Sequence, residues 1–537
     1  MIHDYLLLAV SVLFAVMMLV MLGHKLKIAY PIFLVISGLL ISFIPGLPTF
    51  AIEPDLIFLI FLPPILFEAA WFTSWQDFNK WKKQIFSLAF GLVFLTSIVV
   101  AYLSNSLIPG FTLALGFLLG GVNSPPDAVA ATSVLKNMTV PKKINSILEG
   151  ESLINDASSL IVFKFALAAV LTGQFVWRDA IQDFFMMAIG GTVVGLVLGY
   201  AFAYLLKILP TNSNIDTVIT ILVPYFMYIL AEHLHFSGVL AVVAGGLVMS
   251  YFSHCYLSHT TRLQAGSVWS VLIFTINVII FLLIGLELPI IIKGLSEYTI
   301  KDGIYYSLII GGVIVATRLF YCYALALLQR TSKKFRQENP KFDWKEPFIM
   351  SFAAMRGVVS LAAALSIPVL MNDGTPFPHR NLILLVTFII ILITLVGQGL
   401  LLSPILKLLN IREAESAIPL EKQEVLLLRR LRAAALRRLD SEYSHLFESN
   451  RLVKHQKTRL ENDVFMMEDK QECIASESGA HYKEALEQNK MVLRDLISAQ
   501  RDELRIIKNE KIIDDSVFRT AEVQLDLDEA KITGFNH

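Results

Sequence analysis

The feature that most constrains this chain is a series of apolar stretches that follow one another from residue 4 to residue 408. A helix needs about 20 mostly apolar residues to cross a membrane, and thirteen stretches approach that length. They lie at 4–23, 29–45, 55–72, 84–104, 111–134, 147–172, 181–206, 216–232, 236–252, 265–290, 303–328, 347–370 and 381–408. The sequence therefore predicts an all-α polytopic membrane protein with about 13 transmembrane helices.

Charge divides the chain into two parts near residue 405. Residues 1–404 hold 23 of the 45 Lys and Arg residues, and the remaining 133 residues hold the other 22. We expect a transmembrane domain at 1–408 and a charged helical tail at 409–537, which regulates transport or supports a dimer. The net charge of zero averages these two parts, so it gives no support for a nucleic-acid partner.

Three further observations exclude other classes of protein. The cysteines, Cys255, Cys322 and Cys473, are too few and too scattered for a disulfide framework or a zinc site. The first apolar run lacks a basic leader and a small-residue cleavage site, so we interpret it as a retained span. The tail has no nucleotide-binding or metal-ligand motif. We expect no cofactor and no enzymatic activity.

The basic residues between the spans predict the orientation. Cytoplasmic loops of membrane proteins carry an excess of Lys and Arg. With the N-terminus outside, sixteen basic residues fall in the inner loops and only Arg178, Lys293, Lys301 and Arg380 fall in the outer ones. This distribution favours an odd number of spans, with the N-terminus outside and the tail in the cytoplasm. We expect the protein in the plasma (inner) membrane.

Two of the predicted spans are interrupted at matching positions. Residues 123–127 (Asn-Ser-Pro-Pro-Asp) break the fifth, and Met355-Arg356-Gly357 break the twelfth. Spans 1–6 and 8–13 would then be repeats of opposite orientation, and paired broken helices in inverted halves indicate a transporter site. Either break alone is also typical of ordinary membrane helices, in which Pro and Gly are common.

The sixth span carries the densest group of polar side chains. Ser152 and Asp156 are four residues apart and share a helix face, while Glu151 and Asn155 share the adjacent face. Hydroxyl, amide and carboxylate oxygens are suitable ligands for Na⁺. Burial disfavours the charged form of a carboxylate, so one group can hold either a proton or a cation. We predict that Asp156 carries both, against the alternative of a polar network that only ties helices together.

Other ionisable residues inside the spans are functional hypotheses by default. Asp127 either ligates the cation or caps the half-helix that follows it. Glu68 is either a distal ligand or an interfacial group. Arg318 and Glu151 are the expected internal ion pair. Arg356 is expected to neutralise the negative ends of half-helices or another carboxylate, and both arginines are interpreted as structural.

Six segments of the chain form one recognisable set. In chain order they are 61–68, 124–130, 151–156, 237–241, 277–288 and 355–360. Together they resemble one known family, the monovalent cation/proton antiporters, over roughly residues 5–405. The resemblance is to the electroneutral sodium/proton exchanger branch, and within it to bacterial members with a long cytoplasmic tail.

The resemblance implies a fold, a mechanism and a set of site residues. It implies crossed discontinuous helices, a core domain that carries the ion, a separate domain that forms a homodimer, and elevator-type alternating access. The family's Asn-Asp pair falls on Asn155 and Asp156, and its ligand set falls on Asp127, Ser152 and Asp156, with Glu68 as a further member. The family's Glu–Arg pair falls on Glu151 and Arg318.

Two departures from the family pattern bear on selectivity and stoichiometry. The family often has Thr-Asp-Pro at the first break, where this chain has Pro126-Asp127-Ala128. Without the Thr hydroxyl, only the backbone carbonyl of Pro126 can serve there as a ligand. The electrogenic branch has two adjacent aspartates where this chain has Asn155 and Asp156, so one proton per monovalent cation is the simplest stoichiometry.

These features predict a secondary antiporter that exchanges a monovalent cation, Na⁺ by preference, for H⁺. The alternatives are a K⁺/H⁺ antiporter of the same mechanism and a cation channel or sensor without coupled transport. An intramembrane enzyme that uses Asp127 and Asp156 as a catalytic pair lacks a nucleophile or a metal motif. Uphill cation movement driven by a proton gradient separates the antiporter from the channel.

Overall fold

The computed structural model describes most of the chain in helices. The described residues are 2–26, 29–42, 57–127, 135, 140–173, 177–209, 212–295, 298–331, 344–371, 373–409, 420–448, 450–475, 488, 491–493, 495–503, 525 and 527–529. Contacts divide the chain into two compact units, Met1–Glu413 and Ala414–His537. Within the described residues, extended pairing is limited to two isolated bridges, so the structure confirms the all-helical class.

The described residues of the first unit form twenty helical elements. They are α1 (Ile2–Lys25), α2 (Tyr30–Ser42), η1 (Ile57–Phe61), α4 (Leu62–Phe72), α5 (Trp75–Phe86), η2 (Ser87–Leu92), α6 (Val93–Leu107), α7 (Leu113–Asn123), α9 (Lys142–Thr172), α10 (Trp177–Ile208), α11 (Ser213–His233), α12 (Gly238–Tyr256), α13 (His259–Leu286), α14 (Leu288–Lys293), α15 (Ile300–Thr331), α17 (Lys345–Phe352), α18 (Val358–Leu365), α19 (Arg380–Leu392), η3 (Ile393–Gln398) and α20 (Gly399–Leu409).

Eight helices among the described residues are long and apolar enough to cross a membrane. Each of the thirteen predicted spans overlaps a helix, although several of these helices are shorter than a full crossing. The number thirteen therefore stays a prediction. One span begins earlier than predicted, because α5, η2 and α6 form a continuous helix from Trp75 to Leu107. Its first turns are amphipathic, which the search for apolar runs did not count.

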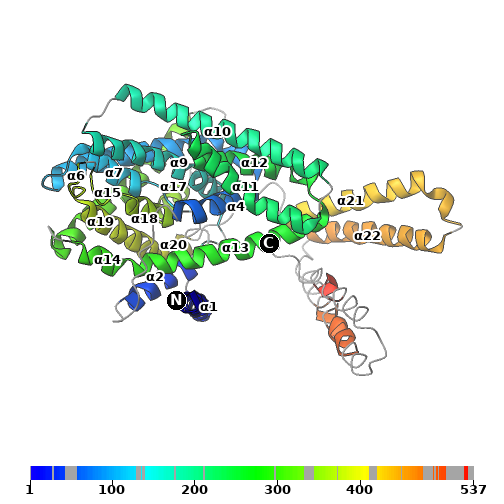
Figure 1. Ribbon diagram of the computed structural model, residues 1–537. Coiled ribbons are helices and arrows are strands. Elements are labelled where there is room, and N and C mark those ends of the chain that lie inside the picture. Colours follow the sequence, from blue (N-terminus) through cyan, green and yellow to red (C-terminus); the bar gives the residue numbers. More distant parts are fainter. Residues whose placement is uncertain are drawn as a thin grey trace. The chain divides into compact units, whose positions relative to one another are not determined.

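The helices of the first unit pack in two groups (Figure 1). In one group, α10 packs with α11 and α12, α12 packs with α4, and α13 packs with α2 and α11. In the other, α7 packs with α6, α9, α18 and α19, and α15 packs with α6, α17 and α19. We call these the α10–α13 group and the α7–α9 group. They meet where α9 contacts α4 and α12, and where α13 contacts α18.

Proline and glycine explain where the regular helices stop. The break after α7 contains Pro125 and Pro126, which cannot donate the backbone hydrogen bonds that would continue a helix. The twelfth predicted span is divided into α17 and α18 by residues 353–357. At the start of α4, Pro63 and Pro64 follow the π-helical turn η1, so the hydrogen-bond pattern changes where the prolines lack an N–H.

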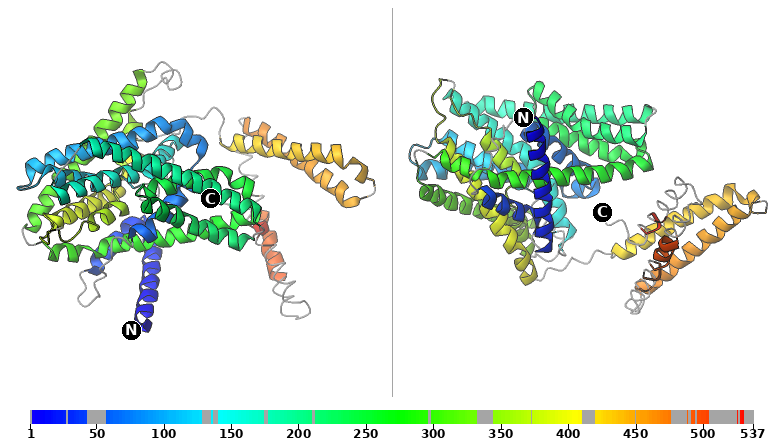
Figure 2. Two further views of the ribbon diagram at one scale, coloured as in Figure 1. Left: turned by 45° about the horizontal axis from the view of Figure 1, so that its top comes forward. Right: turned by 60° about the horizontal axis from the view of Figure 1, so that its bottom comes forward.

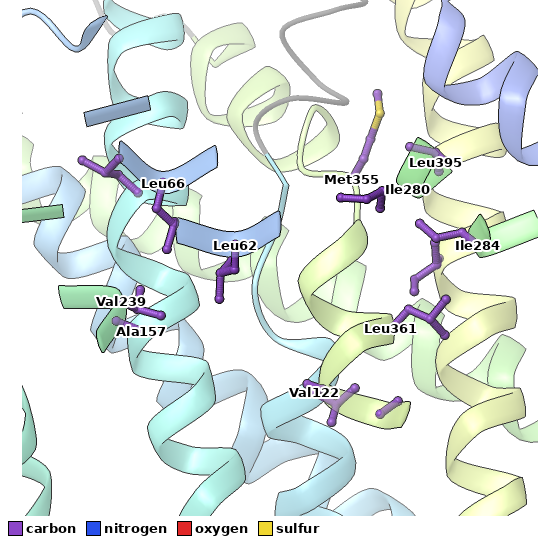
Figure 3. Close-up of a cluster of buried hydrophobic side chains, with 14 of the residues drawn as sticks. Leu62, Leu66, Val122, Ala157, Val239, Ile280, Ile284, Met355, Leu361 and Leu395 are labelled. Atoms are coloured by element: carbon purple, nitrogen blue, oxygen red, sulfur yellow. The ribbon is translucent and has the colours of Figure 1, made fainter. Parts of the chain in front are cut away.

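Apolar side chains fill the space around the two breaks. Figure 3 shows Leu62 and Leu66 of α4, Val122 of α7, Met355 within the second break and Leu361 of α18, all in one buried cluster. Both groups of helices contribute to this cluster. Polar side chains near it are therefore held in apolar surroundings.

The second unit contains a helical hairpin. Its helices α21 (Leu420–Glu442) and α22 (Arg451–Ala475) are joined by a turn with the short helix η4 (Ser444–Leu446), and they pack against each other side by side (Figures 1 and 2). Lys457 forms an ion pair with Asp440 across the hairpin at 2.8 Å. Both helices lie in the tail that the sequence predicts to be helical, of which residues 476–487 and 504–524 fall outside the described residues.

Candidate functional site

The two broken helices meet at their breaks. The N–H of Asp127 donates to the carbonyl of Met355 at 2.6 Å, which forms a short antiparallel bridge between segments more than 200 residues apart. One break follows α7 and the other separates α17 from α18. The extended backbone of each break supplies the hydrogen-bonding group that the other needs, so the two discontinuities support each other.

The meeting point leaves no room for a side chain at Gly357. A Cβ atom built there would collide with the carboxylate of Asp127. Gly357 is the residue that precedes the first turn of α18, and as a glycine it has no side chain to cap that helix. The carboxylate of Asp127 therefore lies beside the positive end of α18, which stabilises a negative charge. The half-helix that Asp127 was predicted to cap, from residue 128 on, lies outside the described residues.

A cavity of about 330 Å³ opens at this crossing. Its polar lining comes from α4 and the residue after it, the first break, α9, α13 and α18, and consists of Glu68, Thr73, Pro126, Asp127, Glu149, Ser152, Asp156, Asn277 and Ser360. Glu149, Ser152 and Asp156 are spaced by three and four residues, so one face of α9 lines the cavity. Asp156 is 8% exposed, while Glu149 is exposed to solvent. The cavity thus connects solvent to a nearly buried carboxylate.

Asn155 lies behind the cavity wall and holds the first break in place. Its side chain is fully buried, and its Nδ2 donates to the carbonyl of Pro126 at 3.0 Å. Pro126 was predicted to offer that carbonyl to the cation. A carbonyl oxygen has two lone pairs, so the bond from Asn155 occupies one of them and fixes the direction of the other.

Glu151 and Arg318 form a bidentate ion pair away from the cavity. The Nη1–Oε1 and Nη2–Oε2 distances are 2.5 Å and 2.7 Å, and both side chains are 1% exposed. Arg318 also donates to the carbonyl of Met350, near the end of α17, from Nε and Nη2. The pair connects α9, α15 and α17, and it leaves no net charge at that place.

Two further arginines bind the ends of half-helices. Nε of Arg356 donates to the carbonyl of Asn123, the last residue of α7, at 3.2 Å. Arg380 donates to the carbonyls of Leu365 and Ile367, at the end of α18, at 3.2 Å and 2.7 Å. A cation is favourable at the negative C-terminal end of a helix. Arg318 of α15 binds α17 in the same way, through the carbonyl of Met350. Each of the three half-helices in the described residues therefore ends on an arginine.

Some of the predicted site residues line the cavity and others lie outside it. Glu68, Pro126, Asp127, Ser152 and Asp156 line one cavity, with Asn155 directly behind it. Glu151, Arg318 and Arg356 do not line it. Sequence reasoning missed Asn277 and Ser360 as lining residues and Arg380 as a helix-end ligand. Asn277 and Ser360 lie in two of the segments that carry the family resemblance, so the resemblance could have identified them as candidate lining residues.

The lining suits a hard monovalent cation. Four carboxylates and the hydroxyls of two serines line one space, and such oxygens bind alkali cations in preference to transition metals. The described residues contain no group of three His, Cys, Asp or Glu placed to hold a metal ion.

Comparison with known proteins agrees with this geometry. Residues 10–408 match the family described as "Sodium/hydrogen exchanger, transmembrane". An uncharacterized Na⁺/H⁺ exchanger of Mycobacterium tuberculosis is 29% identical over 536 residues, which cover 97% of this chain and 95% of the relative. The sodium, potassium, lithium and rubidium/H⁺ antiporter of Bacillus subtilis is 33% identical over 380 residues, which cover 69% of this chain and 56% of the relative.

The fold is also that of a solved structure. The sodium proton antiporter MjNhaP1 from Methanocaldococcus jannaschii superposes with a TM-score of 0.60 at 19% sequence identity. The match covers 76% of this chain and all of the archaeal chain. The match of the family over most of the chain is the decisive finding. The chain belongs to the sodium/hydrogen exchanger family of monovalent cation/proton antiporters.

Proposed function

We propose that this antiporter exchanges one monovalent cation for one proton and that Asp156 binds them alternately. The observation that carries the proposal is the position of Asp156 in the wall of the cavity at the helix crossing. Glu151 is neutralised by Arg318, and the carboxylate of Asp127 lies beside the positive end of α18. Glu149 is exposed to solvent, and Glu68 lies on α4 in the other group of helices. Asp156 is then the nearly buried carboxylate most free to exchange its partner, and a single exchanging carboxylate supports electroneutral transport.

Asp127, Ser152, the carbonyl of Pro126 and Glu68 are the proposed companions of Asp156 in cation binding. Na⁺ is the preferred substrate in this proposal, and K⁺ is the alternative. The printed name of the Bacillus subtilis relative includes sodium, potassium, lithium and rubidium, which supports testing all four cations.

The two groups of helices support an elevator-type movement. Asp156 belongs to the α7–α9 group, whereas Glu68 and Asn277 reach the cavity from α4 and α13 in the other group. If the α7–α9 group slides, Asp156 leaves these two residues and faces the opposite side. The ion pair of Lys164 on α9 with Glu232 on α11, at 2.9 Å, would break in this step.

The proposed setting is the plasma membrane, with the N-terminus outside and the tail of residues 409–537 in the cytoplasm. The excess of basic residues in the predicted inner loops supports this orientation. We propose a homodimer as the working form, with the tail as a regulatory or dimer-supporting segment.

The experiment that tests the proposal is proton flux in purified proteoliposomes. Na⁺, K⁺, Li⁺ or Rb⁺ is added in turn, with the membrane potential clamped at two values. Exchange is expected to depend on the cation and to be insensitive to voltage. Asp156→Asn is expected to abolish it while the protein stays folded, and Asp183→Asn, at an exposed position on α10, is the matched control. Retained transport by Asp156→Asn would remove Asp156 from this role.

A further inference from the structure

Ser360 is a buried hydroxyl group in the wall of the cation cavity. It is the third residue of α18 and is 1% exposed. In the part of the chain that the structure describes, its Oγ has no hydrogen-bond partner. A buried hydroxyl without a partner costs folding free energy, so its presence calls for a ligand that the protein alone does not supply.

The start of α18 explains why Ser360 lacks an internal partner. Buried serines within helices donate to a carbonyl one turn earlier, as Ser97 does to Val93 at 2.8 Å and Ser351 does to Pro347 at 2.7 Å. One turn before Ser360 the chain is not helical, because residues 353–357 form the break. The helix therefore offers the hydroxyl group of Ser360 no backbone carbonyl to donate to.

The cavity supplies what the helix does not. Ser152, Asp127 and Asp156 line the same cavity as Ser360, and a hydroxyl oxygen is a suitable ligand for an alkali cation. We propose that Ser360 contributes its oxygen to the transported cation and helps to set which cation is preferred. This inference rests on the proposed function of the cavity and adds a ligand from the second broken helix.

The packing gives this ligand a constant position relative to Asp156. Helix α18 contacts α7 and α9, so Ser360 and Asp156 belong to the same group of helices. In an elevator movement they travel together, unlike Glu68 and Asn277. Ser360 would therefore bind the cation on both sides of the membrane, and its removal affects affinity in both directions of transport.

The test compares Ser360→Ala with Ser351→Ala. Ser351 is also a buried serine, but its hydroxyl already donates to the carbonyl of Pro347. Two readouts are measured at fixed pH for Na⁺, Li⁺, K⁺ and Rb⁺: the KM of exchange in proteoliposomes, and the half-saturation of cation-dependent thermal stabilisation in detergent. The second readout does not require transport.

Loss of one oxygen ligand is expected to raise both values about fivefold for the preferred cation. Without cation, Ser360→Ala is expected to be at least as stable as the wild type, because an unpartnered hydroxyl is removed. Ser351→Ala is expected to lower the unfolding temperature and leave KM within twofold. If Ser360→Ala does not fold, Ser360→Cys replaces the oxygen with a softer ligand and should weaken Na⁺ and Li⁺ binding in the same way.

The inference is overturned if Ser360→Ala leaves KM and the thermal half-saturation within twofold of the wild type for all four cations. This outcome differs from failure of the proposed function. A wild-type protein without cation-dependent proton flux would reject the antiport mechanism, while its cation-dependent stabilisation would still decide the role of Ser360.

Discussion

Removal of Arg318 is the perturbation with the largest expected effect on stability. Its guanidinium group makes two hydrogen bonds to Glu151 and two to the carbonyl of Met350, and it is 1% exposed. In Arg318→Met the Glu151 carboxylate stays buried without its cation. Breaking a buried pair by removing one partner costs about 3–5 kcal/mol. The loss arises from the remaining charge and not from the pair itself.

A double variant separates the cost of the remaining buried charge from the loss of the ion pair. In the double variant Glu151→Gln/Arg318→Met no buried charge remains, so we expect it to recover more than half of the lost stability. The assay is thermal unfolding of the purified protein in detergent. Arg318→Met is expected to lower the unfolding temperature by at least about 5 °C.

A partly exposed ion pair provides the control. Nζ of Lys143 on α9 lies 2.6 Å from Oε2 of Glu346 on α17, and the two side chains are 19% and 29% exposed. Solvent screens such a pair, so Lys143→Met is expected to cost no more than about 1 kcal/mol. If Arg318→Met is as stable as the wild type, or the double variant is no more stable than the single one, the reasoning about an uncompensated buried charge is refuted.

Two further substitutions test the crossing of the broken helices. Gly357→Ala is expected to abolish exchange, because its Cβ would displace the carboxylate of Asp127. Gly312→Ala is the control, because the space around its Cβ is open. Equal flux from both variants would contradict the expected collision with Asp127. Asn155→Ala removes the bond to the carbonyl of Pro126, and we expect at least about a tenfold loss of kcat/KM for the cation. Unchanged cation-dependent flux from this variant would show that the break holds its position without that bond.

Hydropathy predicted the helical fold because a membrane admits few alternatives. Within the bilayer every backbone polar group needs an internal partner, so long apolar runs become helices. The breaks were visible as well, since Pro125, Pro126 and Gly357 interrupt otherwise apolar spans. What hydropathy could not give is the start of an amphipathic helix such as α5, whose polar face hides it from a search for apolar runs.

The candidate site was predictable in part. The spacing on α9 placed Ser152 and Asp156 on one face, and the structure has both in the cavity wall. Arg380 was counted as an outer-loop charge, yet it donates to backbone carbonyls at the end of α18. Every residue has a backbone carbonyl, so the sequence alone does not show which carbonyls accept a hydrogen bond from an arginine. The unpartnered state of Ser360 was hidden for a related reason, because it depends on where α18 begins.

The arginines at the helix ends have a consequence for how the chain assembles. Glu151 lies in the first half of the transmembrane region, and its cation, Arg318, lies in the second. Likewise α7 ends on a carbonyl that Arg356 binds from the second half. During synthesis the first half therefore enters the membrane before its counter-charges exist. Neither half is electrostatically complete alone, so the two halves are expected to mature together and a separately produced half to be degraded.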